Sequence, residues 1–225
     1  MNIKVIQTVL LVIIAFIPAQ ILQAQLPCSN PQNQLPMIDD FTTGRYRVNL
    51  RQNDDTNVQR GAKIAGCFRL THFIVPPDNQ FNQHATLNIR RQGTLIVSSD
   101  YKVFHRLEVT YGVDAQGQNA PLNLNLRGGG YDRFRVHFDG NDLGVNFNIV
   151  VFDGSGNISS RGFNVDAGTN PFDQDFLFDD FVSNGTPADF TTIAFITLVF
   201  QSGSAMGSND YAITSFEVAN GPVVP

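Results

Sequence analysis

The sequence predicts an all-β protein, an antiparallel sandwich of two sheets that face each other across an apolar core. Residues 131–152 read YDRFRVHFDGNDLGVNFNIVVF, in which apolar and polar residues alternate on both sides of a turn-rich loop at 139–144. Alternation with a period of two is typical of strands with one buried and one solvated face. Similar runs recur between turn clusters along the chain, and we see no helical period after residue 24.

The first 24 residues have the layout of a secretory signal peptide. Lys4 gives a basic start, residues 5–17 are mostly apolar, and Ala24 offers a small residue for cleavage before Gln25. The apolar run is short for a transmembrane span, although an uncleaved anchor is the alternative. We expect a signal helix at 1–24 and an exported protein that is secreted, held at the cell surface or periplasmic, without membrane contact after cleavage.

After the signal peptide, the chain is expected to hold one domain. Residues 25–36 are polar and rich in proline, which predicts an irregular lead-in, and residues 220–225 form a short tail. The roughly 180 residues between them suit one β-sandwich. We therefore place a single sandwich domain at 37–219.

The N-terminal strands are short and separated by polar segments. Runs at 37–41 and 45–50 predict the first two strands, and the polar stretch 51–61 predicts a loop. Residues 67–75 alternate strongly and end at Pro76, because proline cannot donate to a strand ladder. This run predicts a longer strand.

The middle of the chain contains a hairpin and two further strands. Residues 85–90 and 94–98 flank Arg91-Gln92-Gly93, which predicts a β-hairpin. Residues 102–111 alternate again, and 122–126 read LNLNL. Both are expected to be strands.

The central hairpin at 131–152 is followed by the last strands. Strands are expected at 158–165 and 211–218, while 172–181 combines acidic and aromatic residues. The run 193–200 is apolar on both faces, as expected for an interior strand of a two-layer fold.

Composition limits the classes of partner. The formal net charge is −5, and cleavage of the signal peptide would remove a further lysine. A mildly acidic surface argues against nucleic acid and anionic membranes and is compatible with neutral glycans or cations. The chain has 19 Phe and no Trp, so most of the aromatic area is expected in the core.

The two cysteines, Cys28 and Cys67, predict one disulfide bond in an exported protein. The bond would tie the lead-in to the strand that begins at Cys67. Two free thiols are the alternative.

Three stretches resemble secreted bacterial jelly-roll domains of the galactose-binding-like, carbohydrate-binding-module type. They are Ile38-Asp39-Asp40-Phe41, the segment 122–136 with its Gly128-Gly129-Gly130 turn, and Ala188–Ile193 with the closing strand 211–218. The resemblance implies a jelly-roll order of strands. Members of this superfold often bind carbohydrate and often carry a structural calcium ion. Because the resemblance is to a superfold, it informs the architecture more than the activity.

No cofactor is required by the sequence, but a structural Ca²⁺ site is one prediction. In jelly rolls the first and last strands often lie side by side, so Asp39 or Asp40 and Glu217 could supply hard oxygen ligands. The motif Asp153-x-Ser155-x-Asn157 matches part of a calcium loop, but the later ligand positions are missing, which favours a plain turn.

The function expected first is that of a secreted, non-catalytic surface or carbohydrate-binding module. Loops at one end would contact a glycan or another extracellular surface, with Tyr101, Tyr131 and Tyr211 as aromatic candidates. No sequence motif for a catalytic serine or a zinc site is present.

Two alternatives stay open. One is a structural subunit of an extracellular matrix or filament that self-associates through strand edges. The other is a glycan-active hydrolase, which needs two carboxylates across a cleft. No particular pair of carboxylates is indicated by the sequence.

Overall fold

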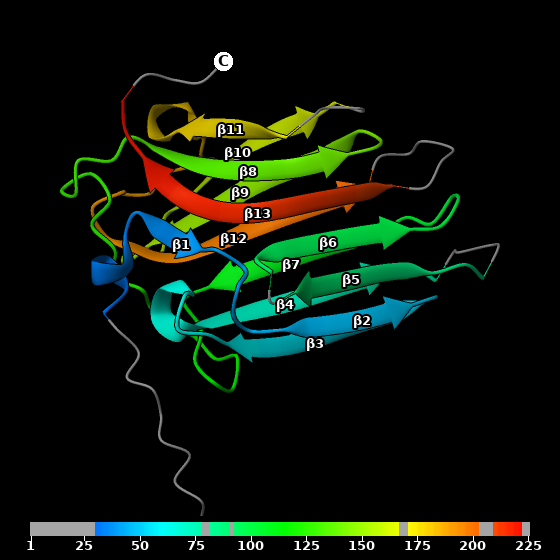
Figure 1. Ribbon diagram of the computed structural model, residues 1–225. Coiled ribbons are helices and arrows are strands. Elements are labelled where there is room, and N and C mark those ends of the chain that lie inside the picture. Colours follow the sequence, from blue (N-terminus) through cyan, green and yellow to red (C-terminus); the bar gives the residue numbers. More distant parts are fainter. Residues whose placement is uncertain (1–29, 78–81, 91, 167–170, 203–208, 222–225) are drawn as a thin grey trace, which may run out of the picture.

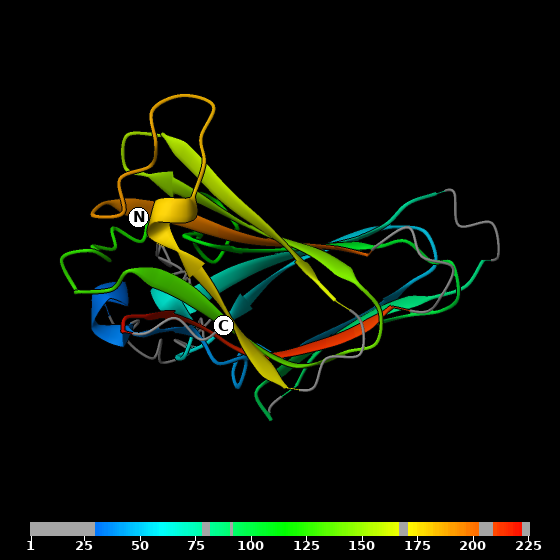
Figure 2. The same cartoon turned by 90° about the horizontal axis from the view of Figure 1, so that it is seen from above.

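The computed structural model describes residues 30–77, 82–90, 92–166, 171–202 and 209–221. Within these ranges every strand pairing is antiparallel, and Figures 1 and 2 show two sheets stacked as two layers. The expected all-β, two-sheet sandwich is confirmed. The predicted signal peptide at 1–24 lies outside the described residues.

The seven-stranded sheet, called sheet A, has the order β11-β8-β13-β6-β5-β2, and β1 pairs with β13. Its strands are β1 (Met37–Asp39), β2 (Tyr46–Leu50), β5 (Ala85–Arg90), β6 (Thr94–Ser99), β8 (Arg133–Asn141), β11 (Phe172–Leu177) and β13 (Asp210–Ala219). The six-stranded sheet, called sheet B, has the order β10-β9-β12-β7-β4-β3. Its strands are β3 (Asn53–Arg60), β4 (Phe68–Val75), β7 (Arg106–Tyr111), β9 (Val145–Asp153), β10 (Ile158–Val165) and β12 (Ile193–Ser202).

Short 3₁₀ turns complete the described elements: η1 (Pro31–Gln34), η2 (Ala65–Cys67) and η3 (Phe178–Asp180). None of the helices in the described ranges is long and apolar enough to cross a bilayer. The turn η1 lies in the lead-in, which was expected to be irregular.

The chain crosses repeatedly between the layers. Consecutive strands change sheet at β2–β3, β4–β5, β6–β7, β7–β8, β8–β9, β10–β11, β11–β12 and β12–β13, and the first strand pairs with the last. These crossings give the jelly-roll type of connection. They also place segments far apart in sequence beside each other.

The predicted central hairpin is wrong in one respect. Both arms are strands, but β8 pairs with β11 and β13 in sheet A, whereas β9 pairs with β10 and β12 in sheet B. The loop at 142–144 therefore crosses between layers. An alternating sequence shows only that a strand has one buried face. Two strands that pair in one sheet and two strands that face each other across a core both show this pattern, so alternation does not distinguish them.

Two other segments differ from their predictions. The polar stretch 51–61 contains β3, which pairs with β4 along its whole length, because an edge strand can carry polar residues. The predicted strand 122–126 has one bridge in the described structure, Leu124 to Ile193, although Leu122, Leu124 and Leu126 are all buried.

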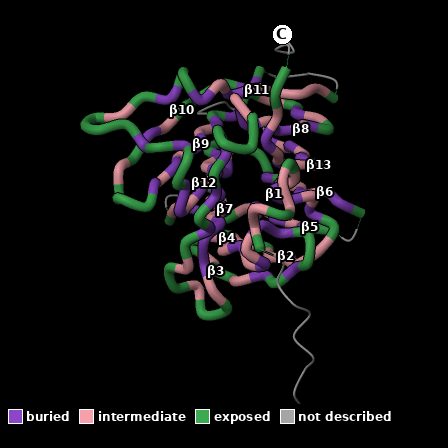
Figure 3. Tube along the Cα trace, turned by 90° about the vertical axis from the view of Figure 1, so that its left-hand side faces the viewer, coloured by how far each residue is buried: buried purple, intermediate pink, exposed green. Residues whose placement is uncertain are grey.

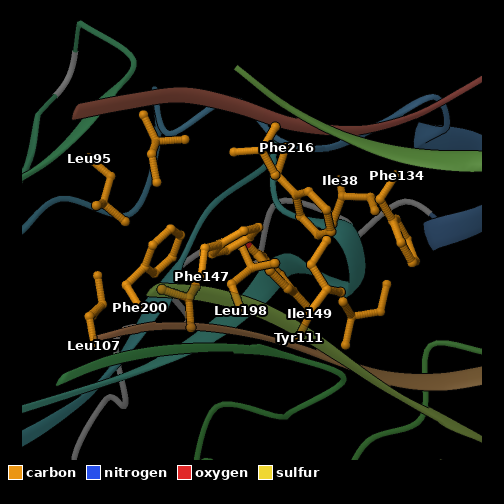
Figure 4. Packing of buried hydrophobic residues seen from close by; sticks show 14 of the residues in the cluster. Ile38, Leu95, Leu107, Tyr111, Phe134, Phe147, Ile149, Leu198, Phe200 and Phe216 are labelled. Atoms are coloured by element: carbon orange, nitrogen blue, oxygen red, sulfur yellow. The ribbon is translucent and has the colours of Figure 1, made fainter. Parts of the chain in front are cut away.

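Aromatic rings fill the space between the sheets, and Figures 3 and 4 show the alternating burial and the packed side chains. Phe147 of sheet B stacks on Phe200 at 4.5 Å and meets Phe138 of sheet A edge-on at 6.0 Å. Tyr111 of sheet B contacts Phe216 of sheet A at 5.9 Å. These contacts between layers hold the inner faces together, and their area dominates the core.

A buried ion pair joins the two sheets at one end. Asp39 at the end of β1 accepts a hydrogen bond at 2.5 Å from the Nη1 of Arg69 on β4, and both side chains are fully buried. The guanidinium also donates to the carbonyls of Thr43 and Gly44 and to Gln59. The Tyr111 hydroxyl and the Phe41 amide donate to the Asp39 carboxylate. All members of this network are hydrogen-bonded, which is the condition under which a buried pair is tolerated.

Removing the charge of Asp39 should strongly destabilise the fold. Asp39→Asn would leave the Arg69 guanidinium buried without a counter-charge, which typically costs about 3–5 kcal/mol. Urea unfolding of the variant would measure the loss. The matched control is Asp40→Asn, because the Asp40 carboxylate lies near the surface and, among the described residues, accepts hydrogen bonds only from Thr42. An Asp39→Asn protein as stable as the control would contradict this account of the network.

Candidate functional site

The structure does not bring the predicted metal ligands together. Asp39 points into the core and is occupied by Arg69, while Asp40 accepts hydrogen bonds from Thr42. Glu217 lies on the outer face of sheet A. Among the described residues, no group of three or more His, Cys, Asp or Glu side chains could hold a metal ion. Asp39, Asp40 and Glu217 therefore do not form one site, and a structural calcium ion elsewhere stays a prediction.

The motif that begins at Asp153 forms a turn, as the sequence favoured. The Asp153 carboxylate accepts hydrogen bonds from the amides of Ser155, Asn157 and Asp189 and from the Asn157 side chain. Burial alone would raise the pKa of Asp153, but these four hydrogen bonds together lower it below its usual value. The carboxylate is thus occupied by the turn.

The three predicted tyrosines do not form one surface. Tyr101 is 47% exposed, Tyr131 is half-buried, and Tyr211 is only 2% exposed. Tyr211 stacks on Phe200 at 5.4 Å within the core, so it cannot contact a glycan. A register shift between Ile213 and Ser215 explains the error, because an irregularity in the strand exchanges the inner and outer faces.

The predicted disulfide falls partly outside the described residues. Cys67 is buried at the end of η2, but Cys28 lies outside the described ranges. The Cys28–Cys67 bond therefore stays a prediction.

Glu217 belongs to a ladder of charges across β11, β8 and β13 on the outer face of sheet A. Arg135 lies directly between Asp175 and Glu217, and its Nε contacts Asp175 at 2.7 Å. Arg133 pairs with Asp132 and Asp175, and His137 contacts Asp173 at 2.5 Å. Each of these basic side chains therefore has a carboxylate partner within the ladder.

A different face carries uncommitted polar groups. On the outer face of sheet B, a hollow of about 500 Å³ spans β7, β9, β10 and β12. Register places one row of side chains directly across all four strands: Asn164, Asn146, Gln201 and Arg106. Strands in a sheet lie about 4.8 Å apart, so this row is about 14 Å long.

A second row lies beside the first and is less polar. It runs from Gly162 through Asn148 and Val199 to Glu108. Gly162 has no side chain, and a Cβ built there would meet its nearest neighbours only at ordinary contact distances, 3.8 and 4.0 Å. Val199 of this row and Val150 form the apolar part of the hollow, and Glu108 at the end of the row is not among its lining residues.

The amides in the hollow have unused hydrogen-bonding capacity. Within the described part of the chain, the side chains of Asn146, Asn164 and Gln201 make no hydrogen bond, and the buried Oδ1 of Asn148 has no partner. Each amide offers a carbonyl acceptor and two N–H donors. The Asn148 oxygen can therefore accept a hydrogen bond from a ligand or from water.

In another amide-lined hollow, near η1, the amides are already hydrogen-bonded within the protein. Gln32 and Asn125 are hydrogen-bonded to each other's segment, and Asn123 donates to the carbonyl of Pro121. The contrast identifies the outer face of sheet B as the candidate site. No carboxylate is among the residues that line its hollow, so two-carboxylate chemistry has no basis there.

The sequence alone does not identify this row of amides as a site. Asn146 and Asn148 were expected on the solvated face of their strand, opposite Val145 and Phe147. The available signal was asparagine in place of the charged or small residues of an ordinary solvated face. Asn164 and Gln201 join them only through pairings distant in sequence.

Comparisons with known proteins show a resemblance of fold. No protein-family model matches the sequence, and no curated protein matches it. The chain resembles carbohydrate-binding modules in structure: the family 11 module of the Clostridium thermocellum cellulase Lic26A-Cel5E has 11% identity and a TM-score of 0.39, covering 82% of this chain and 94% of that one. TmCBM61, solved with β-1,4-galactotriose, has 13% identity and a TM-score of 0.32, covering 58% and 84%.

A longer protein is also similar in part. The agarase AgWH50C has 15% identity and a TM-score of 0.41, and the match covers 68% of this chain. This chain spans only 23% of the length of that agarase.

Glu217 gives a prediction about pH. Burial raises the pKa of Glu217 above its usual value, nearby Asp173 and Asp175 add to the rise, and Arg135 partly offsets it. Folding therefore favours the protonated form of Glu217. Above the pKa of Glu217 in the folded protein, its ionisation lowers the free energy of unfolding, and this loss disappears as the pH falls toward the pKa of the unfolded chain. Glu217→Gln should raise the melting temperature at pH 7, and the difference should vanish near pH 4.

Thermal unfolding at the two pH values measures this effect. Glu108→Gln is the matched control, because Glu108 has an Arg106 partner at 2.6 Å and should gain nothing from the change. A Glu217→Gln protein that is less stable than the wild type at pH 7 would refute the assignment.

Proposed function

We propose that this protein is a non-catalytic carbohydrate-binding module that binds a neutral glycan on the outer face of sheet B. The observation that carries the proposal is the row Asn164, Asn146, Gln201 and Arg106, in which the three amides have no hydrogen-bond partner in the described structure. The row crosses four strands, so one extended ligand could contact all of its members.

The chemistry of the row fits sugar hydroxyls. A hydroxyl group both donates and accepts hydrogen bonds, and so does a carboxamide, so neighbouring amides can bind neighbouring hydroxyls in pairs. Val150 and Val199 offer apolar surface beside the row for the C–H faces of a sugar ring. An anionic ligand would gain little from Arg106, because its guanidinium is already paired with the Glu108 carboxylate.

Binding without catalysis is supported by the lining of the hollow, which contains no carboxylate. An exported location, secreted, cell-surface or periplasmic, agrees with the predicted signal peptide and gives access to extracellular glycans. The alternative of a matrix or filament subunit stays an untested prediction.

The proposal is tested by measuring binding to a panel of neutral glycans by affinity electrophoresis and calorimetry. The panel includes a β-1,3-1,4-mixed-linked tetrasaccharide and β-1,4-galactotriose, which are bound in solved structures of similar modules. The protein is expected to bind at least one neutral oligosaccharide without added metal. Absence of binding across a broad panel would refute the proposal.

Two variants locate the binding face. Gly162→Val should fill the hollow while keeping the strand, since valine favours strands and the site has room for a Cβ. Asn146→Ala with Gln201→Ala should weaken binding about tenfold or more, because each lost hydrogen bond contributes about 0.5–1.5 kcal/mol. Gln116→Ala, an exposed amide in the 114–118 loop, is the control and should bind normally. Equal binding by all these proteins would place the ligand elsewhere.

A further inference from the structure

A second hollow, of about 530 Å³, lies on the outer face of sheet A, over its edge strand β2 and the neighbouring β5. Three arginines line it: Arg45, Arg47 and Arg90. Register pairs Arg47 directly with Asn88, and Arg45 lies two residues earlier on the chain. Asn88 and Gln92 add two amides to the lining. This surface, called the arginine hollow, is on the opposite side of the sandwich from the amide row.

The three arginines differ from those at the other edge of the same sheet. There, Arg133 and Arg135 contact Asp132 and Asp175 at distances between 2.6 and 3.1 Å. In the described structure, Arg45, Arg47 and Arg90 have no carboxylate within 4.0 Å and no side-chain hydrogen bond. The chain has 20 acidic residues against 15 basic ones, so carboxylates are not scarce.

Unpaired arginines gathered in one hollow create a local positive field in an acidic protein. Like charges close together repel, and an anion bound among them relieves the repulsion. The planar guanidinium forms paired hydrogen bonds with carboxylate and with other planar or tetrahedral oxyanions, which makes arginine more selective than lysine for these groups. The hollow is therefore suited to a ligand with more than one anionic group.

The lining also favours one class of anionic ligand. Asn88 and Gln92 can bind hydroxyls next to the anionic groups, as a charged sugar would present them. We propose that the arginine hollow binds the carboxylate or sulfate groups of an acidic polysaccharide, independently of the neutral-glycan face on sheet B.

Affinity electrophoresis in gels that contain polygalacturonate, dextran sulfate, neutral dextran or DNA tests this proposal. The purified protein should be retarded by polygalacturonate or by dextran sulfate. The polymer that retards it shows whether the hollow binds carboxylate or sulfate groups. Arg47→Ala with Arg90→Ala should reduce the affinity about tenfold or more, since charge-assisted hydrogen bonds are lost. Arg47→Lys with Arg90→Lys should restore only part of the affinity, because lysine cannot form the paired contact.

Two controls separate this site from general charge and from the amide row. Arg161 is an exposed arginine on β10 of sheet B, and its guanidinium lies 4.0 Å from the Asp180 carboxylate. Arg161→Ala should leave the retardation of the protein in these gels unchanged. Gly162→Val should also leave it unchanged, so failure of the neutral-glycan proposal would not affect this result. The proposal is overturned if neither acidic polysaccharide binds, if Arg161→Ala weakens binding equally, or if DNA binds as tightly through the same arginines.

Discussion

The structure depends on the packing of aromatic rings between two sheets. Phe138 and Phe147 meet across the layers, as do Tyr111 and Phe216, and the central strands of both sheets contribute apolar faces to this interface. Burial of the inner faces leaves both outer faces in water. The outer faces carry polar side chains, with amides in the hollow of sheet B and arginines over β2 and β5 of sheet A.

Some polar groups of the sandwich are paired with each other, and others on its outer faces are not. The Arg69–Asp39 network and the charge ladder of β8 are closed, because each basic group there has an acidic partner. The amides of sheet B and the arginines over β2 and β5 lack such partners in the described residues. Committed groups stabilise the fold, and the available ones define where ligands can gain hydrogen bonds that the protein has not already made.

The sequence predicted the strands well and their neighbours poorly. Alternation located β8 and β9, but a period of two is the same whether two strands pair or face each other across a core, so the crossing at 142–144 was missed. At Tyr211 the strict period was broken by an irregularity of the strand, which moved the tyrosine into the core. The amide row could not be predicted, because Asn164, Asn146 and Gln201 become neighbours only through the order of strands in sheet B.

The central claim is that recognition uses the outer face of sheet B instead of end loops. Titration of ¹⁵N-labelled protein with a neutral oligosaccharide, followed by two-dimensional NMR, tests it residue by residue. We expect chemical-shift changes concentrated in β7, β9, β10 and β12, with the Asn146 and Gln201 side-chain amides among the largest. Changes confined to the loops around Tyr101 and Tyr131, or no changes with any neutral oligosaccharide, would contradict it.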